Sequence, residues 1–430
     1  MAEVVSIAPE NEGDIALSVR LGRWWQLSLG VICMSMIANL QYGWTLFVNP
    51  IHDKHGWSLS AIQVAFTVFV VVETWLVPVE GYLVDRFGPQ LVGVAAGIMV
   101  ALAWVINSMA TTLPMLYLGA VVAGLGAGAV YGACVGNALK WFPDRRGLAA
   151  GLTAMGYGAG SAFTVSPIAN MIKAQGYEAT FFKFGIVQGA VVFIVAWFLR
   201  APDPQFMSTH APAKKKNAPA RARENTPMEM LRTPTFWIMY AMFVLTAAGG
   251  LIATAQLTPI AKDFGLAATP ITMLGITSAT LTMALSMNRV LNGVSRPFFG
   301  WVSDHLGREN TMFVAFAIEG VSILLLAQFG ASPFAFVVLT GVTFFAYGEI
   351  YSLFPAMCGD AYGRKFASAN AGLMYTAKGA ASLLVPLSSV IGATKGGWHS
   401  VFIVAAMMNL LAAVLALVAL KPARIRLEQA

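Results

Sequence analysis

Long apolar runs, separated by short polar breaks, recur from one end of the chain to the other. A run of about twenty apolar residues can cross a bilayer as a helix, whereas a membrane β-barrel shows segments of about ten residues with alternating polarity. The pattern therefore predicts an all-α membrane protein. We expect twelve transmembrane helices at residues 22–47, 59–83, 90–110, 114–139, 148–172, 179–199, 233–259, 269–299, 311–329, 332–356, 367–392 and 397–420.

One long polar segment divides these runs into two groups. It is rich in proline and basic residues, including Lys214 to Lys216, and is typical of a linker. It ends in Thr226, Pro227 and Glu229, the order of an N-cap, a first-turn proline and a capping-box acid, which predicts a short surface helix. The expected organisation is an N-terminal tail, a six-helix bundle, a linker with its short helix, a second six-helix bundle and a C-terminal tail, at 1–21, 22–199, 200–232, 233–420 and 421–430.

The two groups repeat each other in sequence. VPVEGYLVDRFGPQ (77–90) aligns with RPFFGWVSDHLGRE (296–309), so that a proline, two glycines and an aspartate coincide. Duplicated six-helix units occur in transporters that bind substrate between their halves near the bilayer midplane. A generic turn is one interpretation of the repeated loop. The other is a gate closed by an aspartate that meets an arginine or a helix N-terminus, with Asp85, Arg86, Asp304 and Arg308 as candidates.

The basic residues predict the orientation of the chain. It is 57% apolar and 11% charged, with a net charge of +7. Of the 27 lysines and arginines, only a few fall on one predicted side of the membrane, namely Lys54, Lys173, Lys183, Lys262 and Lys395. The positive-inside rule therefore predicts that both termini are cytoplasmic. The same asymmetry explains the net charge without nucleic-acid binding.

Two cations, Arg296 and Lys378, fall inside predicted helices of the second group only. A cation near the bilayer centre costs about 3 kcal/mol even on insertion scales, so it faces protein or water and usually serves a function. Arginine offers a planar fork to a carboxylate, and lysine offers a compact point charge. The pair would suit a small dicarboxylate, or a carboxylate with one neutral end. The alternative is that both cations are paired structurally with buried acids.

Glu73 and Glu349 lie in other predicted helices, and Arg289 lies two turns before Arg296 in the same one; each of these buried charges must pair, take up a proton or face water. We expect one of the acids to form an ion pair with Arg289, or to carry a coupling proton. Aromatic and polar residues at similar depth would clamp a flat anion and exclude water. They complete the candidate substrate site: Gln41, Tyr42, Trp44, Tyr131, Tyr157, Tyr347, Tyr351 and Tyr375.

The remaining reactive residues indicate no cofactor and no metal. Cys33, Cys134 and Cys358 lie in or at the ends of apolar segments, as small core residues do, and the histidines are scattered without partners at metal-ligand spacing. No nucleophile and base pattern suggests an enzyme, and no soluble signalling domain suggests a sensor. We expect a monomer surrounded by lipid.

The repeated loop around Gly81, Asp85, Arg86 and Gly88 resembles the signature of the major facilitator superfamily. The segments QYGWTLFVNP, VYGACVGNALKWFPDRRGLAAGLTAMGYGAG, EMLRTPTFW and NGVSRPFFGWVSDHLGRENT are similar to the oxalate/formate antiporter family, and the resemblance spans nearly the whole chain. It implies twelve helices in two pseudo-symmetric halves and exchange of small carboxylates such as oxalate and formate by alternating access. It also implies carboxylate binding by Arg296 and Lys378, within a cage of Gln41, Tyr42, Tyr131, Tyr157 and Tyr351.

Some charges depart from that family's pattern. Glu73, Arg289 and Glu349 are additional, so the site could prefer another anion. The span around Arg296 is also similar to that of proton-linked monocarboxylate transporters, which place an aspartate one turn earlier, where this chain has Asn292. Proton-coupled symport of monocarboxylates, with Glu73 or Glu349 carrying the proton, is therefore the alternative function.

Overall fold

The computed structural model describes residues 12–142, 145–202, 225–363, 366–392, 394 and 397–429, except for the side chains of 12–21, 85, 146–147, 367–368 and 428–429. Helices make up nearly all of the described chain. They are α1 (Glu12–Tyr42), α2 (Trp44–His55), α3 (Leu59–Trp75), α4 (Val77–Ser108), α5 (Leu113–Trp141), α6 (Arg146–Ala159), α7 (Val165–Ala196), α9 (Pro227–Leu231), α10 (Pro234–Asp263), α11 (Thr280–Leu306), α12 (Arg308–Phe329), α13 (Pro333–Tyr347), α14 (Ile350–Tyr362), α15 (Ala367–Ser382), α16 (Leu384–Gly392), α17 (Gly397–Leu415) and α18 (Lys421–Gln429), with a π-helical turn, η1 (Ala416–Leu420), before α18.

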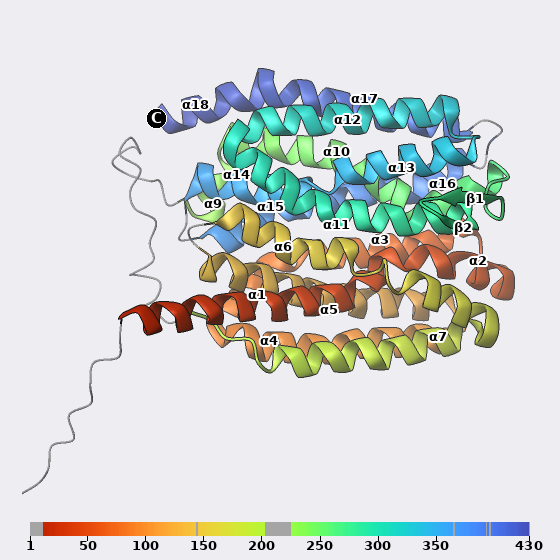
Figure 1. Cartoon of the computed structure of the whole chain (residues 1–430), viewed down its shortest axis with the longest axis horizontal. Helices are drawn as coiled ribbons and strands as arrows, with labels where there is room; N and C mark the ends of the chain where they lie inside the picture. The colour runs from red at the N-terminus through yellow and green to blue at the C-terminus, as the bar shows by residue number, and fades with distance from the viewer. Residues whose placement is uncertain are drawn as a thin grey trace, which may run out of the picture.

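The helices form two stacked groups, α1–α7 and α10–α18, which run along the long axis of the molecule (Figure 1). Helix α3 packs on α15, and α6 packs on α11, where the two groups meet. The start of α1 and the end of α18 lie at one end of the molecule, and a small β-hairpin lies at the other. Within the described residues, eight helical stretches are long and apolar enough to cross a membrane, or nine if the bent pair Leu59–Trp75 and Val77–Val84 is one span. The all-α membrane fold is confirmed.

The sequence repeat has a structural counterpart in two glycines. Gly88 has φ 84° and ψ 158° and bends α4, while Gly307 has φ 86° and ψ 153° and separates α11 from α12. This part of φ/ψ space is essentially restricted to glycine. The chain therefore turns in the same way at equivalent points of the two groups, which fits the predicted duplication.

The predicted start of the span at 269–299 is wrong. Strands β1 (Pro270–Met273) and β2 (Ile276–Ala279) pair there as an antiparallel hairpin, and α11 begins only at Thr280. The turn residues Leu274 and Gly275 both have positive φ, 51° and 77°, as hairpin turns of type I′ require. Each strand contains an isoleucine followed by a threonine, and the branched side chains of both favour strands. The average hydropathy of this segment does not reveal the hairpin.

The predicted surface helix is confirmed as α9. The Thr226 side chain accepts a hydrogen bond from the Glu229 backbone N–H (3.3 Å), and the Thr226 N–H donates to the Glu229 carboxylate (2.7 Å), which forms the capping box. These hydrogen bonds from Thr226 hold the pKa of Glu229 below its usual value. Lys214 to Lys216 of the predicted linker lie outside the described residues.

The three cysteines are core residues, as predicted. Cys33, Cys134 and Cys358 are 1%, 2% and 1% exposed, and none forms a disulfide. Cys358 lies near the sulfur of Met230 in α9 (3.7 Å), so the surface helix is packed against the end of the second group.

Candidate functional site

Arg296 lies past the middle of α11, at the junction of the two groups, and is completely buried. Its Nη1 donates to the carbonyl of Ala154 in α6 (2.8 Å), and its Nη2 donates to the Tyr42 hydroxyl and to Asn292 Oδ1 (both 3.0 Å). The Tyr351 ring centroid lies 4.3 Å from its guanidinium carbon. No acid in the described part of the chain forms an ion pair with it. Among the described residues, only neutral hydrogen-bond acceptors and an aromatic ring contact this charge. A buried cation in such surroundings favours the binding of an anion.

Lys378 reaches the same region from α15 and is also completely buried. Its ammonium donates to Gln41 Oε1 and Glu73 Oε2 (both 2.8 Å) and to the Tyr375 hydroxyl (3.0 Å). An ammonium has three hydrogens, so these partners engage all of them. Lys378 and Glu73 are therefore a buried ion pair that joins the second group of helices to the first.

Tyr157 in α6 extends this network within the first group. Its hydroxyl lies 2.8 Å from Gln41 Oε1 and 2.9 Å from Glu73 Oε1, so each Glu73 oxygen has a partner. Its ring lies 5.4 Å from the Lys378 nitrogen. Glu73 is thus held from two sides in a network without contact to water.

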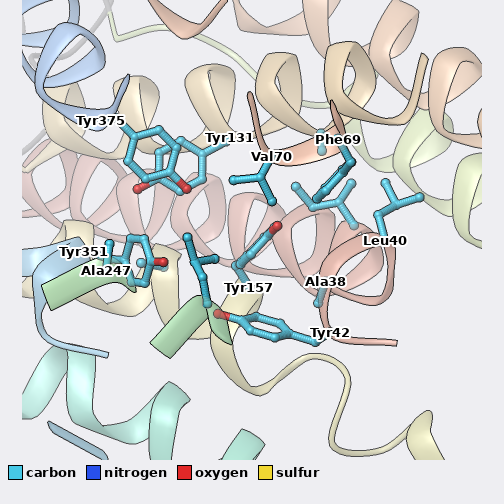
Figure 2. Close-up of a cluster of buried hydrophobic side chains, with 14 of the residues drawn as sticks. Ala38, Leu40, Tyr42, Phe69, Val70, Tyr131, Tyr157, Ala247, Tyr351 and Tyr375 are labelled. Atoms are coloured by element: carbon cyan, nitrogen blue, oxygen red, sulfur yellow. The ribbon is translucent and has the colours of Figure 1, made fainter. Parts of the chain in front are cut away.

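Five tyrosines lie together in one buried cluster, and Figure 2 labels each of them: Tyr42, Tyr131, Tyr157, Tyr351 and Tyr375. Tyr131 and Tyr375 stack with ring centroids 4.7 Å apart, Tyr42 packs edge-on against Tyr157 at 5.4 Å, and Tyr351 lies 6.0 Å from Tyr375. All five are buried, between 1% and 6% exposed. Rings of this cluster lie close to both cations: Tyr351 lies close to Arg296, and Tyr157, Tyr351 and Tyr375 lie close to Lys378.

Two predicted site residues lie further from the cations. Trp44 donates to Gln63 Oε1 (3.1 Å) and lines a small cavity with Phe47 and Phe66, and none of its described contacts involves Arg296 or Lys378. Tyr347 reaches the site indirectly, since its hydroxyl bonds to that of Tyr351 (2.5 Å).

The buried acids and Arg289 do not pair as expected. Glu73 bonds to Lys378 instead of Arg289. Arg289 lies between the rings of Tyr42 (4.4 Å) and Phe344 (5.0 Å), and none of its guanidinium nitrogens has a hydrogen-bond partner among the described residues. Both carboxylate oxygens of Glu349, which is completely buried, likewise lack a partner there.

Arg308, Asp304 and Asp360 form a charged cluster at the α18 end of the molecule, with Arg308 at its centre. Arg308 pairs with Asp304 (2.7 Å) in α11 and with Asp360 (3.0 Å) in α14. In the first group, Arg86 lies near the Tyr82 hydroxyl (3.4 Å) and the Phe87 ring. The side chain of Asp85 lies outside the described residues, so this cluster is described for the second group only.

The two groups touch on both sides of the cations. On the hairpin side, Thr45 in α2 donates to Thr258 in α10 (2.9 Å), and Gln63 donates to the carbonyl of Ala255 (3.0 Å). On the other side, a Cβ added to Gly372 in α15 would meet a methyl of Val77 at 3.1 Å. The site is therefore enclosed at both ends.

Some partners could not be found from the sequence. Glu73 and Lys378 are 305 positions apart, and the Ala154 carbonyl carries no residue-type signal at all. Asn292 lies one turn before Arg296, which makes it a detectable candidate. Nothing in the sequence around Asp360, near the end of α14, marks it as a partner of Arg308.

Comparisons with known proteins agree with this architecture. The model of the Major Facilitator Superfamily matches residues 27–288 and 266–429. The chain is 36% identical to the oxalate:formate antiporter of Oxalobacter formigenes over 92% of this chain and 90% of that protein. It is 26% identical to the uncharacterized transporter YhjX of Escherichia coli K12 over 84% and 86%, and 23% identical to monocarboxylate transporter 12 of Xenopus laevis over 79% and 75%.

Proposed function

Because the chain belongs to the major facilitator superfamily and, within it, to the oxalate/formate antiporter family, we propose that it exchanges small carboxylate anions across the bacterial inner membrane. Membership makes the protein a multi-pass membrane transporter and not an enzyme. Arg296 is the observation that carries the proposal. It is a buried cation between the two helical groups, without an acidic partner in the described chain and with an unpartnered Nε.

A substrate carboxylate would bind at Arg296, between the faces of Tyr42 and Tyr351. The guanidinium presents five hydrogens in a fixed plane, and the described contacts account for three of them. The remaining two, on Nε and Nη1, lie on different edges of the guanidinium, so each can meet one oxygen acceptor. The glycine at position 158 supports this use, because a Cβ there would lie 3.0 Å from Arg296 Nε.

We also propose twelve spans and alternating access. The described helices that fall short of the span criterion include α11, whose polar residues lower its hydropathy, and α6, α15 and α16, which are each shorter than 18 residues. In alternating access, the two groups would separate first on the hairpin side and then on the α18 side. We propose further that both termini are cytoplasmic and that the protein is a monomer. The ion pairs of Arg308 with Asp304 and Asp360 would hold the α18 side closed.

Counterflow in proteoliposomes tests the exchange. Vesicles loaded with unlabelled oxalate should accumulate labelled oxalate whether or not a pH gradient is present, and formate should compete. Arg296→Lys should weaken this exchange while inserting normally, because it loses the planar fork. Normal exchange by that variant would contradict the site.

Proton-coupled monocarboxylate symport is the second candidate. The buried carboxylate of Glu349, without a partner in the described chain, is the observation that favours it. Uptake of a monocarboxylate that needs an inward proton gradient, together with no oxalate counterflow, would support symport and reject exchange.

A further inference from the structure

We propose that Glu73 sets the charge of the substrate: by neutralising Lys378, it makes the site select carboxylates with one negative charge over dianions. The inference rests on the proposed function, since it concerns the substrate of the same site. It assigns to Glu73 a role in specificity, as a positioning residue that acts through Lys378.

The first step is the occupancy of Lys378. All three ammonium hydrogens are engaged, by Gln41, Glu73 and Tyr375 at 2.8 to 3.0 Å. A second substrate carboxylate could reach the ammonium only by displacing Glu73. The displaced acid would then lack its cation in a buried network, and separating a buried ion pair is strongly unfavourable.

The second step is the charge of the site. Arg296, Lys378 and Glu73 are the charged residues within the hydrogen-bond network of the site, and together they leave a single positive charge; Arg289, which contacts the Tyr42 ring without a described hydrogen bond, lies outside that network. A monoanion neutralises this single positive charge, whereas a dianion leaves an excess negative charge in a buried region, where uncompensated charge is costly.

Three other buried charged residues lie near the site without touching Lys378. Arg289 stacks on Tyr42. Glu349, at the break between α13 and α14, and Glu80, one helix after Glu73, have no described hydrogen-bond partner for either carboxylate oxygen. None of them is in the hydrogen-bond network that engages the ammonium.

The pair could instead serve only to hold the two groups of helices together. That role predicts that loss of Glu73 weakens exchange of every substrate by the same factor. A role in specificity predicts a change in the ratio between a monoanion and a dianion of the same shape. Oxamate and oxalate are such a pair, because oxamate carries an amide in place of one carboxylate.

The experiment compares labelled oxamate with labelled oxalate in counterflow, for the wild type, Glu73→Gln and Glu80→Gln in proteoliposomes. For the wild type, the half-saturating concentration of oxamate should be at least tenfold lower than that of oxalate. Glu73→Gln should reverse the preference, because Lys378 then offers its charge to the second carboxylate. Glu80→Gln, a matched change of a nearby buried acid that does not contact Lys378, should keep the preference of the wild type.

Each outcome decides the inference. A wild type that prefers oxalate, or a Glu73→Gln variant that slows both substrates equally, overturns it and leaves the proposed exchange intact. If Glu73→Gln does not insert, the preference of the wild type decides alone. If the wild type exchanges neither oxamate nor oxalate nor formate, the proposed function fails and the inference fails with it.

Discussion

Replacing Lys378 with glutamine should destabilise the protein mainly through the acid that it leaves behind. Glu73 would keep the Tyr157 hydroxyl but lose its cation, and it is completely buried. Breaking a buried ion pair by removing one partner costs about 3–5 kcal/mol.

The expected loss in the free energy of unfolding is therefore about 3–5 kcal/mol. The assay is the apparent free energy of unfolding in mixed micelles titrated with sodium dodecyl sulfate. Lys262→Gln, a change of an exposed lysine, is the control and should stay close to the wild type.

The double variant Glu73→Gln/Lys378→Gln should recover most of the loss, since it removes both charges and keeps two amides that can bond to each other. Two results would refute the reasoning. One is a Lys378→Gln variant that is as stable as the wild type. The other is a double variant whose loss equals the sum of the two single losses.

Three further predictions concern transport. Arg296→Lys should raise the half-saturating concentration of substrate at least tenfold, which corresponds to one lost charged hydrogen bond of about 1.5–3 kcal/mol, and saturation curves in proteoliposomes measure it. Gly158→Ala should lower exchange severalfold, because its Cβ would lie 3.0 Å from Arg296 Nε; unchanged saturation curves would show that this space is not used by substrate. Arg308→Ala should change the maximal exchange rate and leave thermal stability nearly constant, because its partners Asp304 and Asp360 are 40% and 56% exposed and exposed ion pairs contribute about 0–1 kcal/mol each. A large loss of stability without a change in rate would reject a gating role.

The sequence predicts what depends on composition and short-range order. Apolar runs identify most of the long helices, and Thr226 with Glu229 predicts the capping box of α9. The aligned positions Gly88 and Gly307 predict equivalent turns. These features are local, because each depends on residues within a few turns of one another.

Local sequence patterns do not predict which side chains contact each other in the site. The sequence identifies Lys378 and Glu73 as costly buried charges, but it does not pair them, because they meet only when α3 packs against α15. The same holds for the aromatic surroundings of Arg289, which replace the expected acid. The hairpin before α11 was missed for another reason, since it is apolar enough to continue a predicted span and only its turn residues mark it as separate.

The burial of all three cysteines makes the natural chain a ready template for site-directed labelling. Cys33, Cys134 and Cys358 are at most 2% exposed, so a membrane-impermeant maleimide should leave them unmodified in the folded protein. A thiol introduced at Ile276 in the hairpin (61% exposed), or at Ile425 in α18 (41% exposed), would then be the reactive one. These two positions mark opposite ends of the molecule (Figure 1), so intact cells would report the sidedness of each end without prior removal of the native thiols.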